Sequence, residues 1–354
     1  MKESILVTGA NGHLGANTIR SLLEKGYSVR AFVRKNADLR GLIDLPVEII
    51  YGDIRDKSTV IRAAKGCRVI IHHAAVYKLW GKTVEAIMEP AIEGAKNVFQ
   101  AASNAGIERV VYTSSTFAIG GTADPKKILT EKDWNEKRHI PYGYAKTKSE
   151  QLAWELSEKY KVGMIALLPG AIYGRYDYRI TPSNRMILDM IKGKGMTIKN
   201  KISFIDSRDA GALHALAVEK GKIGERYILA GEAMTMKALG ELVQELSGIK
   251  VSHMPLGRSM NIMMARIMET IAKLTKEEPP ITVGIVREYS HRYAQYDNSK
   301  TLRDFDYQLL PAEETLRDTI RWLTFISEHK LSNKLKETFS PLPDWTTGTV
   351  GHLI

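Results

Sequence analysis

A short apolar stretch followed by a glycine-rich turn opens the chain and constrains its fold more than any other feature. Residues 4–7 are mainly apolar and suited to a strand, and Thr8-Gly9-Ala10-Asn11-Gly12-His13-Leu14-Gly15 follows them directly. Gly9 can form a tight turn, Gly12 lets the backbone approach a pyrophosphate, and Gly15 lets a helix pack closely on the strand. Because the first N–H groups of that helix face the anion, the stretch predicts a dinucleotide-binding unit.

Strand and helix patterns continue to alternate after this unit. Apolar strand-like segments recur at 28–33, 47–51, 68–71, 109–113, 162–168 and 227–231. This alternation predicts an α/β fold, a Rossmann doubly wound parallel sheet with a smaller C-terminal α/β substrate-binding region. We expect the nucleotide-binding domain over 1–170, completed by parts of 200–232, then a mainly substrate-binding region over 171–326 and a tail over 327–354. Pro90 predicts a kink or break in the helix expected over 84–106.

Composition narrows the class of protein. The 354 residues are 44% hydrophobic, which is enough for a proper core, and the formal net charge is +11. Lys and Arg are scattered among acidic residues, so the positive field suits a phosphorylated cofactor. We expect a small-molecule substrate as partner and no nucleic acid. Cys67 is the single cysteine, which excludes an intrachain disulfide and fits a reducing compartment. We see no secretory leader and no apolar run of about 20 residues, so the expected location is cytoplasmic.

The residues at the end of the second strand bear on which cofactor is bound. Arg34 and Lys35 stand where a carboxylate would bind the ribose of NAD. A guanidinium suits a 2′-phosphate, so NADP is favoured, with NAD still open.

Polar or small residues also follow the third and fourth strands, at the edge where parallel sheets bind ligands. Asp53 and Ile54 follow the third strand, and His72-His73-Ala74-Ala75 follows the fourth. The small Ala74 and Ala75 would let a cofactor lie against the backbone. The two histidines have no HxxxH, HExxH or cysteine partner, so we predict no metal site.

A serine, a tyrosine and a lysine supply the candidate chemistry. The fifth strand delivers Ser115 to its carboxyl end, where a hydroxyl can bond a substrate carbonyl. Tyr142 and Lys146 are four residues apart, so on a helix they share a face, about one turn apart. A neighbouring ammonium favours the phenolate and should lower the tyrosine pKa from about 10 towards the working range.

These segments resemble the extended short-chain dehydrogenase/reductases of the dihydroflavonol-reductase-like branch over about residues 1–326. The resemblance rests on the glycine turn and on the segments 26–34, 65–67, 89–94 and 112–115. Within the branch, 74–80, 180–193 and 224–232 are most similar to the bacterial hopanoid-associated sugar epimerases. The resemblance implies a catalytic set of Ser115, Tyr142 and Lys146. It implies cofactor contacts from Gly9, Asn11, Gly12, His13, Leu14, Gly15, Arg34, Lys35, Asp53, Ile54, Ala74, Ala75, Tyr142, Lys146, Pro169 and Ile172.

Two positions depart from the pattern of this branch. Members that have an asparagine in the helix before the fifth strand place it in an Asn-Val-x-Gly pattern, and this chain has Ala91-Ile92-Glu93-Gly94 there. A proton relay through that asparagine is therefore not expected. Flavonoid-reducing members have an asparagine five positions after the serine, where this chain has Gly120, so a flavonoid is not the expected substrate.

The resulting hypothesis is reversible hydride transfer between nicotinamide and a carbonyl or secondary alcohol carbon. Tyr142 would move the proton, Ser115 would hold the carbonyl oxygen, and Lys146 would bind the nicotinamide ribose. A sugar-nucleotide epimerase or dehydratase that retains NAD(P) is the first alternative. A non-catalytic NADP-binding sensor or scaffold is the second.

The substrate pocket and the partners are less constrained by sequence. Residues that flank the cofactor and catalytic segments are the expected pocket lining: Tyr77, Trp80, Thr116, Phe117, Tyr173 and Arg179. The segment 253–275 carries a methionine-rich helical stripe, interpreted as a core or lid helix. An adaptable face over an apolar substrate and a membrane-surface helix are its alternatives. A homodimer and peripheral membrane contact stay open.

Overall fold

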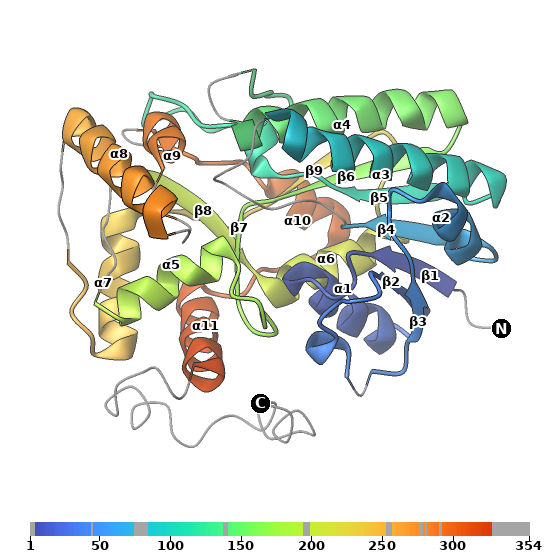
Figure 1. The fold of residues 1–354 in the computed structure, drawn as a ribbon, viewed down its shortest axis with the longest axis horizontal. Coiled ribbons are helices and arrows are strands. Elements are labelled where there is room, and N and C mark those ends of the chain that lie inside the picture. Colours follow the sequence, from blue (N-terminus) through green and yellow to red (C-terminus); the bar gives the residue numbers. More distant parts are fainter. Residues whose placement is uncertain are drawn as a thin grey trace.

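A parallel seven-stranded sheet forms the centre of the computed structural model (Figure 1). The structure describes residues 4–43, 45–73, 84–136, 141–193, 199–252, 257–275, 279, 282–289 and 292–327. The strand order is β3-β2-β1-β4-β5-β6-β9, and every pairing is parallel. These strands are β1 (Ser4–Thr8), β2 (Ser28–Val33), β3 (Glu48–Tyr51), β4 (Val69–His72), β5 (Arg109–Thr113), β6 (Gly163–Pro169) and β9 (Arg226–Leu229). The predicted doubly wound fold is confirmed.

Helices cover both faces of this sheet. Successive strand residues point to opposite sides, and apolar residues on both sides are buried by these helices. Leu6 packs in the core beneath α2, α3 and α4, whereas Ile5 and Val7 pack in the core beneath α1 and α6. These helices are α1 (His13–Glu24), α2 (Lys57–Ala64), α3 (Val84–Asn104), α4 (Pro141–Tyr160) and α6 (Ser207–Ala217), with short 3-10 turns η1 (Arg40–Leu42) and η2 (Thr116–Ala118). Strands buried on both sides explain the near-continuous apolar runs in the sequence.

Helix α3 contains Pro90, where a kink or a break was predicted. The helix continues through the proline instead of breaking there. A proline removes one backbone hydrogen bond, and the buried face of α3, which includes Val98 and Phe99, holds the rest of the helix against the sheet. A break at Pro90 is therefore excluded, and the kink, the other predicted outcome, stays a prediction.

A smaller α/β region follows β6. Its three-stranded sheet has the order β10-β8-β7, and a separate apolar core packs around it. The elements after β6 other than β9 and α6 are β7 (Ala171–Tyr173), α5 (Pro182–Ile191), β8 (Lys201–Asp206), β10 (Ala233–Thr235), α7 (Met236–Ser247), α8 (Arg258–Thr275), α9 (Val283–Tyr289), α10 (Ser299–Phe305) and α11 (Ala312–Ile326).

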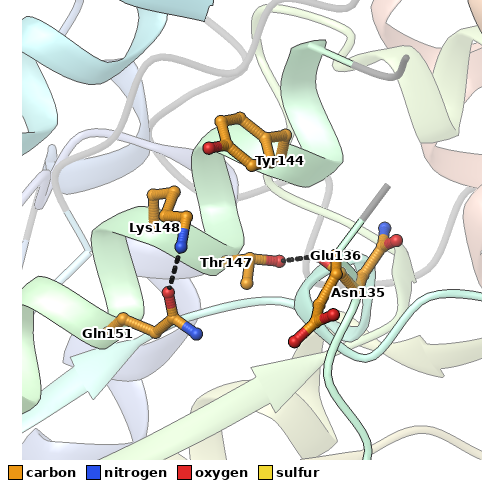
Figure 2. Close-up of a pocket in the computed structure, with 6 residues that line it drawn as sticks. All are labelled: Asn135, Glu136, Tyr144, Thr147, Lys148 and Gln151. Atoms are coloured by element: carbon orange, nitrogen blue, oxygen red, sulfur yellow. Dashed lines mark hydrogen bonds between the residues drawn. The ribbon is translucent and has the colours of Figure 1, made fainter. Parts of the chain in front are cut away.

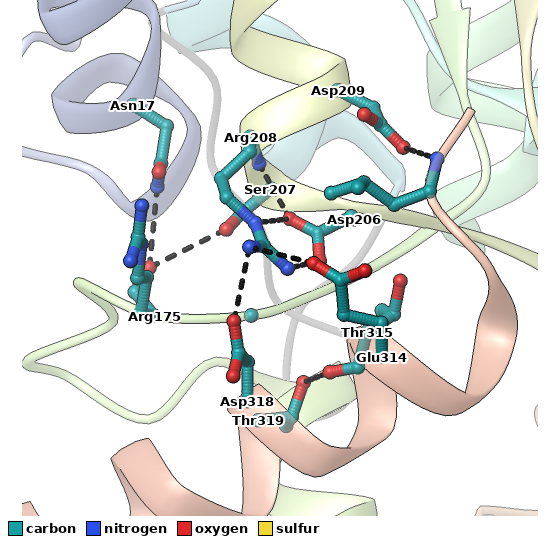
Figure 3. Close-up of polar contacts among 12 residues, drawn as sticks. Asn17, Arg175, Asp206, Ser207, Arg208, Asp209, Glu314, Thr315, Asp318 and Thr319 are labelled. Atoms are coloured by element: carbon teal, nitrogen blue, oxygen red, sulfur yellow. Dashed lines mark hydrogen bonds and ion pairs between the residues drawn. The ribbon is translucent and has the colours of Figure 1, made fainter. Parts of the chain in front are cut away.

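Polar contacts join this region to the large sheet. At the start of α6, Arg208 pairs with Asp206 at 2.7 Å and reaches across to Asp318 of α11 at 3.0 Å and to Glu314 at 3.3 Å (Figure 3). Asn17 of α1 donates to the carbonyl of Arg175 at 3.2 Å. The helix after the glycine turn is therefore held against the loop that follows β7.

The methionine-rich helix α8 lies at one end of the molecule and packs on α9 (Figure 1). Its apolar stripe is exposed to solvent, so the interpretation as a core helix was wrong for these side chains. The residues that α8 does bury are mostly small, Ala265 and Ala272 among them. Helical periodicity identified the stripe, but it could not tell which side of the helix the rest of the chain would cover.

Candidate active site

The glycine turn has the geometry that a dinucleotide requires. Gly9 has a φ of +66°, in the left-handed region that favours glycine, and its carbonyl accepts a bond from the N–H of Gly12 at 3.0 Å. A Cβ on Gly15 would stand 2.4 Å from the Gly9 oxygen, so no larger residue fits there. Gly12 precedes α1 without a side-chain cap. The first N–H groups of α1 are therefore available to an anion such as a pyrophosphate.

Two predicted cofactor residues of this turn hold neighbouring loops. The Asn11 side-chain amide donates to the carbonyl of Asp38 at 3.1 Å, which ties the turn to the loop after β2. The buried His13 imidazole lies 3.8 Å from the carboxylate of Asp177. Leu14 packs on the core beneath α1. These side chains therefore fix the position of the glycine turn.

Arg179, predicted to line the substrate pocket, lies beside the glycine turn. Its Nη2 is 3.6 Å from the position that a Cβ on Gly12 would occupy. Together with the stronger hydrogen bond from Arg40, its charge lowers the pKa of Asp38. The loop before Arg179 is held by Asp177, which accepts bonds at 2.7 Å from both the N–H and the hydroxyl of Thr181. A guanidinium is thus placed near the uncapped start of α1.

The side chains that follow β2 and β3 lie at the same sheet edge. Arg34 and Lys35 are exposed. Asp53 is bound by Arg55, with Oδ2 and Nη2 2.7 Å apart, and this bond, aided by the charge of Arg34, lowers the pKa of Asp53 to about 2. Ile54 presents its carbonyl to the amide of Asn97 at 3.0 Å. The edge therefore carries the exposed Arg34 and Lys35 and a carboxylate that is ionised at neutral pH.

A hydrogen-bonded chain runs below the carboxyl ends of β4 and β5. His214 Nδ1 lies 2.7 Å from the Ala210 carbonyl and so donates to it, which leaves Nε2 to accept from the Thr113 hydroxyl at 3.0 Å. The same hydroxyl oxygen then accepts from His73 Nδ1 at 2.8 Å. Burial lowers the pKa of His214 to about 4 and that of His73 far below its usual range, so both rings are neutral.

The hydrogen bonds from His214 through Thr113 to His73 leave His73 Nε2 as an acceptor. That atom is buried and has no hydrogen-bond partner among the described residues. His72 is held separately, with its Nδ1 2.8 Å from the Thr8 hydroxyl. Among the described residues, no group of three or more His, Cys, Asp or Glu side chains could hold a metal ion.

Ser115 is the second residue after β5 and caps the start of the turn η2. It is buried, and its Oγ accepts a bond from the N–H of Phe117 at 3.2 Å. A hydroxyl that accepts this bond still carries its own O–H donor. Two predicted pocket residues adjoin it: Thr116 bonds the carbonyl of Pro169 at 3.4 Å, and the ring of Phe117 meets that of Tyr142 edge-on, with centroids 5.0 Å apart.

Tyr142 and Lys146 lie in the first two turns of α4. Tyr142 is 6% exposed and packs with Phe117. The Lys146 ammonium is close enough to His72 and His73 that its charge lowers their pKa values, after the larger effect of burial. Burial also lowers the pKa of Lys146 itself, to about 8. The Lys146 ammonium therefore lies near the carboxyl end of β4, where His72 and His73 stand.

A second pair with the same spacing, Tyr144 and Lys148, lies on another side of α4. Both residues line a pocket of about 260 Å³ together with Asn135, Glu136, Thr147 and Gln151 (Figure 2). Lys148 donates to Gln151 at 2.8 Å in this pocket. None of the predicted catalytic residues lines it. The sequence alone contains two overlapping tyrosine–lysine pairs, and the structure distinguishes them by the surroundings of each lysine.

Sequence reasoning missed two residues that support this site, Glu150 and Arg226. Glu150 is fully buried, accepts from the Ser114 hydroxyl at 2.5 Å, and pairs with Arg226 Nε at 2.7 Å. The Arg226 guanidinium also stacks on Trp134 at 3.8 Å. The spacing of Tyr142, Lys146 and Glu150, each four residues apart, was the signal that could have identified the carboxylate.

The remaining predicted residues fall into two groups. Tyr173 is fully buried in the core of the smaller region, with its ring 5.0 Å from that of Phe204, so its position gives no support to a role in lining a pocket. Pro169 ends β6, and Ile172 lies in β7 paired with Ile205. Ala74, Ala75, Tyr77 and Trp80 lie outside the described residues.

Gly120 has a backbone that an asparagine would not adopt easily. Its φ is +89°, and a Cβ there would stand 3.0 Å from the side chain of Asn135. Asn135 is itself bonded to the Phe117 carbonyl at 3.0 Å. The backbone conformation and the neighbouring Asn135 therefore favour glycine at position 120.

Comparison with known proteins matches this architecture to one family. The profile described as "NAD dependent epimerase/dehydratase family" matches residues 5–230. A dihydroflavonol 4-reductase-like protein of Synechocystis is 30% identical over 328 residues, covering 91% of this chain and 95% of its own length. Sterol demethylase protein B of Methylococcus capsulatus is 35% identical over 246 residues, covering 69% and 74%. The crystal structure of gox2253 has a TM-score of 0.81 at 30% identity, covering 94% of this chain and 100% of its own.

Proposed function

This chain belongs to the NAD-dependent epimerase/dehydratase family, whose members are NAD(P)-dependent reductases and epimerases that act on carbonyl or alcohol groups, and from that premise we propose a specific activity for it. The protein is an NADP-dependent oxidoreductase that transfers hydride between nicotinamide and a carbonyl or secondary alcohol carbon of a small molecule. When bound, nicotinamide supplies the hydride donor or acceptor. The residues of this chain bind and orient the cofactor and the substrate, and they move the proton.

The orientation of Lys146 carries the proposal. Its ammonium acts on the buried histidines at the carboxyl ends of the strands, whereas Lys148 bonds Gln151 on another side of the helix. Lys146 is therefore the lysine available to bind a ribose hydroxyl beside Tyr142. Its positive charge favours the phenolate of Tyr142, so that the phenol can release a proton to the substrate oxygen and recover it in the reverse reaction.

Ser115 completes the catalytic set in this proposal. Its position after β5 and its buried hydroxyl suit a donor that holds a carbonyl oxygen while Tyr142 delivers the proton. Glu150 accepts a hydrogen bond from the hydroxyl of Ser114, the residue before Ser115, and so holds the end of β5 in place. The serine is thus held by backbone and side-chain contacts before any substrate binds.

The cofactor is proposed to lie across the carboxyl edge of the sheet. The uncapped start of α1 and the missing Cβ atom of Gly12 leave room for a pyrophosphate, and Gly15 lets α1 pack against the glycine turn. Arg179, beside Gly12, would add a charge-assisted bond to it. Arg34 and Lys35, exposed after β2, suit the 2′-phosphate that distinguishes NADP from NAD.

Two tyrosine substitutions test the activity. Tyr142→Phe should lower turnover of NADPH with a panel of aromatic and aliphatic aldehydes and ketones by about 10²–10⁴-fold, because the proton donor is lost. NADPH binding, followed by fluorescence titration, should change little. Tyr144→Phe is the matched control on the same helix and should keep full activity. The assignment fails if Tyr144→Phe inactivates the enzyme and Tyr142→Phe does not.

The same assay separates the alternatives. A sugar-nucleotide epimerase would interconvert its substrate while its retained cofactor showed no net oxidation. A sensor would bind NADPH with no turnover of any carbonyl or nucleotide sugar, and Tyr142→Phe would then have no catalytic effect to show.

A further inference from the structure

Helix α8 exposes an unbroken apolar stripe. Its members are spaced by three or four residues, so they lie on one face of the helix. They are Met260 (45% exposed), Met263 (50%), Ile267 (52%), Ile271 (52%) and Leu274 (80%). Contiguous apolar surface of this kind on a folded protein marks an interaction site.

The opposite side of α8 faces the protein. Asn261, Ala265 and Ala272 are buried there, and α9 packs against the helix. The Glu269 carboxylate accepts a bond from the N–H of Val283 at 2.9 Å, at the start of α9. The helix is thus anchored by one side, and the stripe faces outward.

The charges on α8 are unequal in sign. Arg258, Arg266 and Lys273 are exposed, and Glu269 is the single acidic residue of the helix. Arg266 and Lys273, seven residues apart, lie on one flank of the stripe. Arg258 adds a cation at the start of the helix, where it bonds the carbonyl of the exposed Arg287 at 3.3 Å. The exposed face is therefore apolar in the middle and cationic beside it.

We propose that α8 docks the protein onto an anionic phospholipid surface, with the stripe inserted among the acyl chains and the cations against the head groups. An amphipathic helix with Lys and Arg beside an apolar face lies in the plane of a bilayer interface in this way. The charge pattern favours an anionic bilayer over a second copy of this chain, whose α8 would carry the same positive charge.

The placement of α8 suits this role. The helix lies at the end of the molecule away from α1, α2 and the first strands (Figure 1). Docking there leaves the edge at the glycine turn open to a soluble cofactor. In the part of the chain that the structure describes, no helix is both long and apolar enough to cross a membrane, so the contact proposed is peripheral.

Vesicle sedimentation with the full chain tests the proposal. The unaltered protein should bind vesicles of equal parts phosphatidylglycerol and phosphatidylcholine. The double substitution Ile267→Glu with Ile271→Glu should weaken this binding by at least about 100-fold, because it removes apolar insertion and adds negative charge. Ile223→Glu is the matched control: Ile223 is 54% exposed but follows α6, far from α8 in the sequence, and binding should be unchanged.

A second arm tests the charges. Arg266→Gln with Lys273→Gln should weaken binding by roughly 30-fold at low salt, at about fivefold per cation, and the loss should shrink as salt is raised. Pure phosphatidylcholine vesicles should bind the unaltered protein weakly.

Three outcomes overturn the proposal. The unaltered chain fails to bind anionic vesicles, as it would if another part of the chain covered α8. The glutamate variants bind as well as the Ile223→Glu control. Light scattering without lipid shows a dimer that the Ile267→Glu and Ile271→Glu substitutions dissociate while vesicle binding is absent, which would assign the stripe to a second copy.

Discussion

Arg226 and Glu150 form a buried ion pair, with Arg226 Nε 2.7 Å from Glu150 Oε1, that connects β9 to α4 behind the proposed catalytic serine. Glu150 also accepts a hydrogen bond from the hydroxyl of Ser114. A strand, a helix and the end of β5 thus meet at one carboxylate. The pair is largely buried, and Glu150 supplies the negative charge for a guanidinium that also donates to the backbone carbonyls of Glu131 and Asp133.

Glu150→Ala is therefore expected to destabilise the fold by about 3–5 kcal/mol, since it leaves a buried guanidinium without its counter-charge. Urea denaturation followed by circular dichroism measures the change. Glu93→Ala removes the surface pair with Lys96, 2.9 Å long in α3, and should cost less than about 1 kcal/mol. Equal losses in the two variants would mean that Arg226 is solvated by other groups.

Lys146 gives a pH dependence to the proposed reaction. Burial lowers the pKa of its ammonium to about 8, so the charge that favours the Tyr142 phenolate is present below that pH and lost above it. We expect kcat/KM for carbonyl reduction to fall with an apparent pKa near 8. The guanidinium of Lys146→Arg stays charged to above pH 12. The fall of kcat/KM should therefore move to higher pH in whatever activity this variant retains.

Lys148→Arg is the control for that experiment, because Lys148 bonds Gln151 away from the histidines. Its pH profile should match that of the unaltered enzyme. A basic limb that moves with Lys148→Arg and not with Lys146→Arg would contradict the assignment of the pair.

The sheet could be predicted because local patterns determine it. The glycine turn after β1 and the apolar runs of the later strands indicate a parallel sheet, and the rules of parallel connections restrict its order. The buried pair of Glu150 and Arg226 could not be predicted in the same way, since 76 residues separate its members. Neither residue belongs to a motif, and the contact exists only after β9 has joined the sheet beside β6.

The placement of Arg179 shows a second limit. Its loop contains Tyr176 and Ile180, both with positive φ, which no propensity predicts for a bulky or β-branched residue. Asp177 stabilises this backbone through Thr181 and Asn184. The loop therefore turns towards the glycine turn, and a residue assigned by its sequence neighbours to a substrate pocket lies near the expected pyrophosphate.

The preference for NADP is expected to depend on Arg34. Arg34→Ala should raise the KM for NADPH by about 10- to 100-fold, the value of a lost charge-assisted bond, and change the KM for NADH little. Arg62→Ala, an exposed arginine in α2, controls for the general loss of positive charge. Equal effects on both cofactors would place the 2′-phosphate elsewhere or make NAD the cofactor.

The neutral histidine chain predicts how stability depends on pH. Burial lowers the pKa of His214 from 6.5 to about 4. Between pH 4 and pH 6.5, the imidazole therefore binds a proton in the unfolded chain but not in the folded protein. Its contribution is present above pH 6.5 and is lost as the pH falls towards 4; between pH 7 and pH 5 the loss is about 2 kcal/mol.

His214→Gln removes this titration and should flatten the decline of unfolding free energy over that interval, measured by urea denaturation at each pH. The variant also loses contacts with Thr113 and Ala210, so the slope with pH, and not the absolute stability, is the diagnostic quantity. An unchanged slope would show that His214 takes up its proton without unfolding.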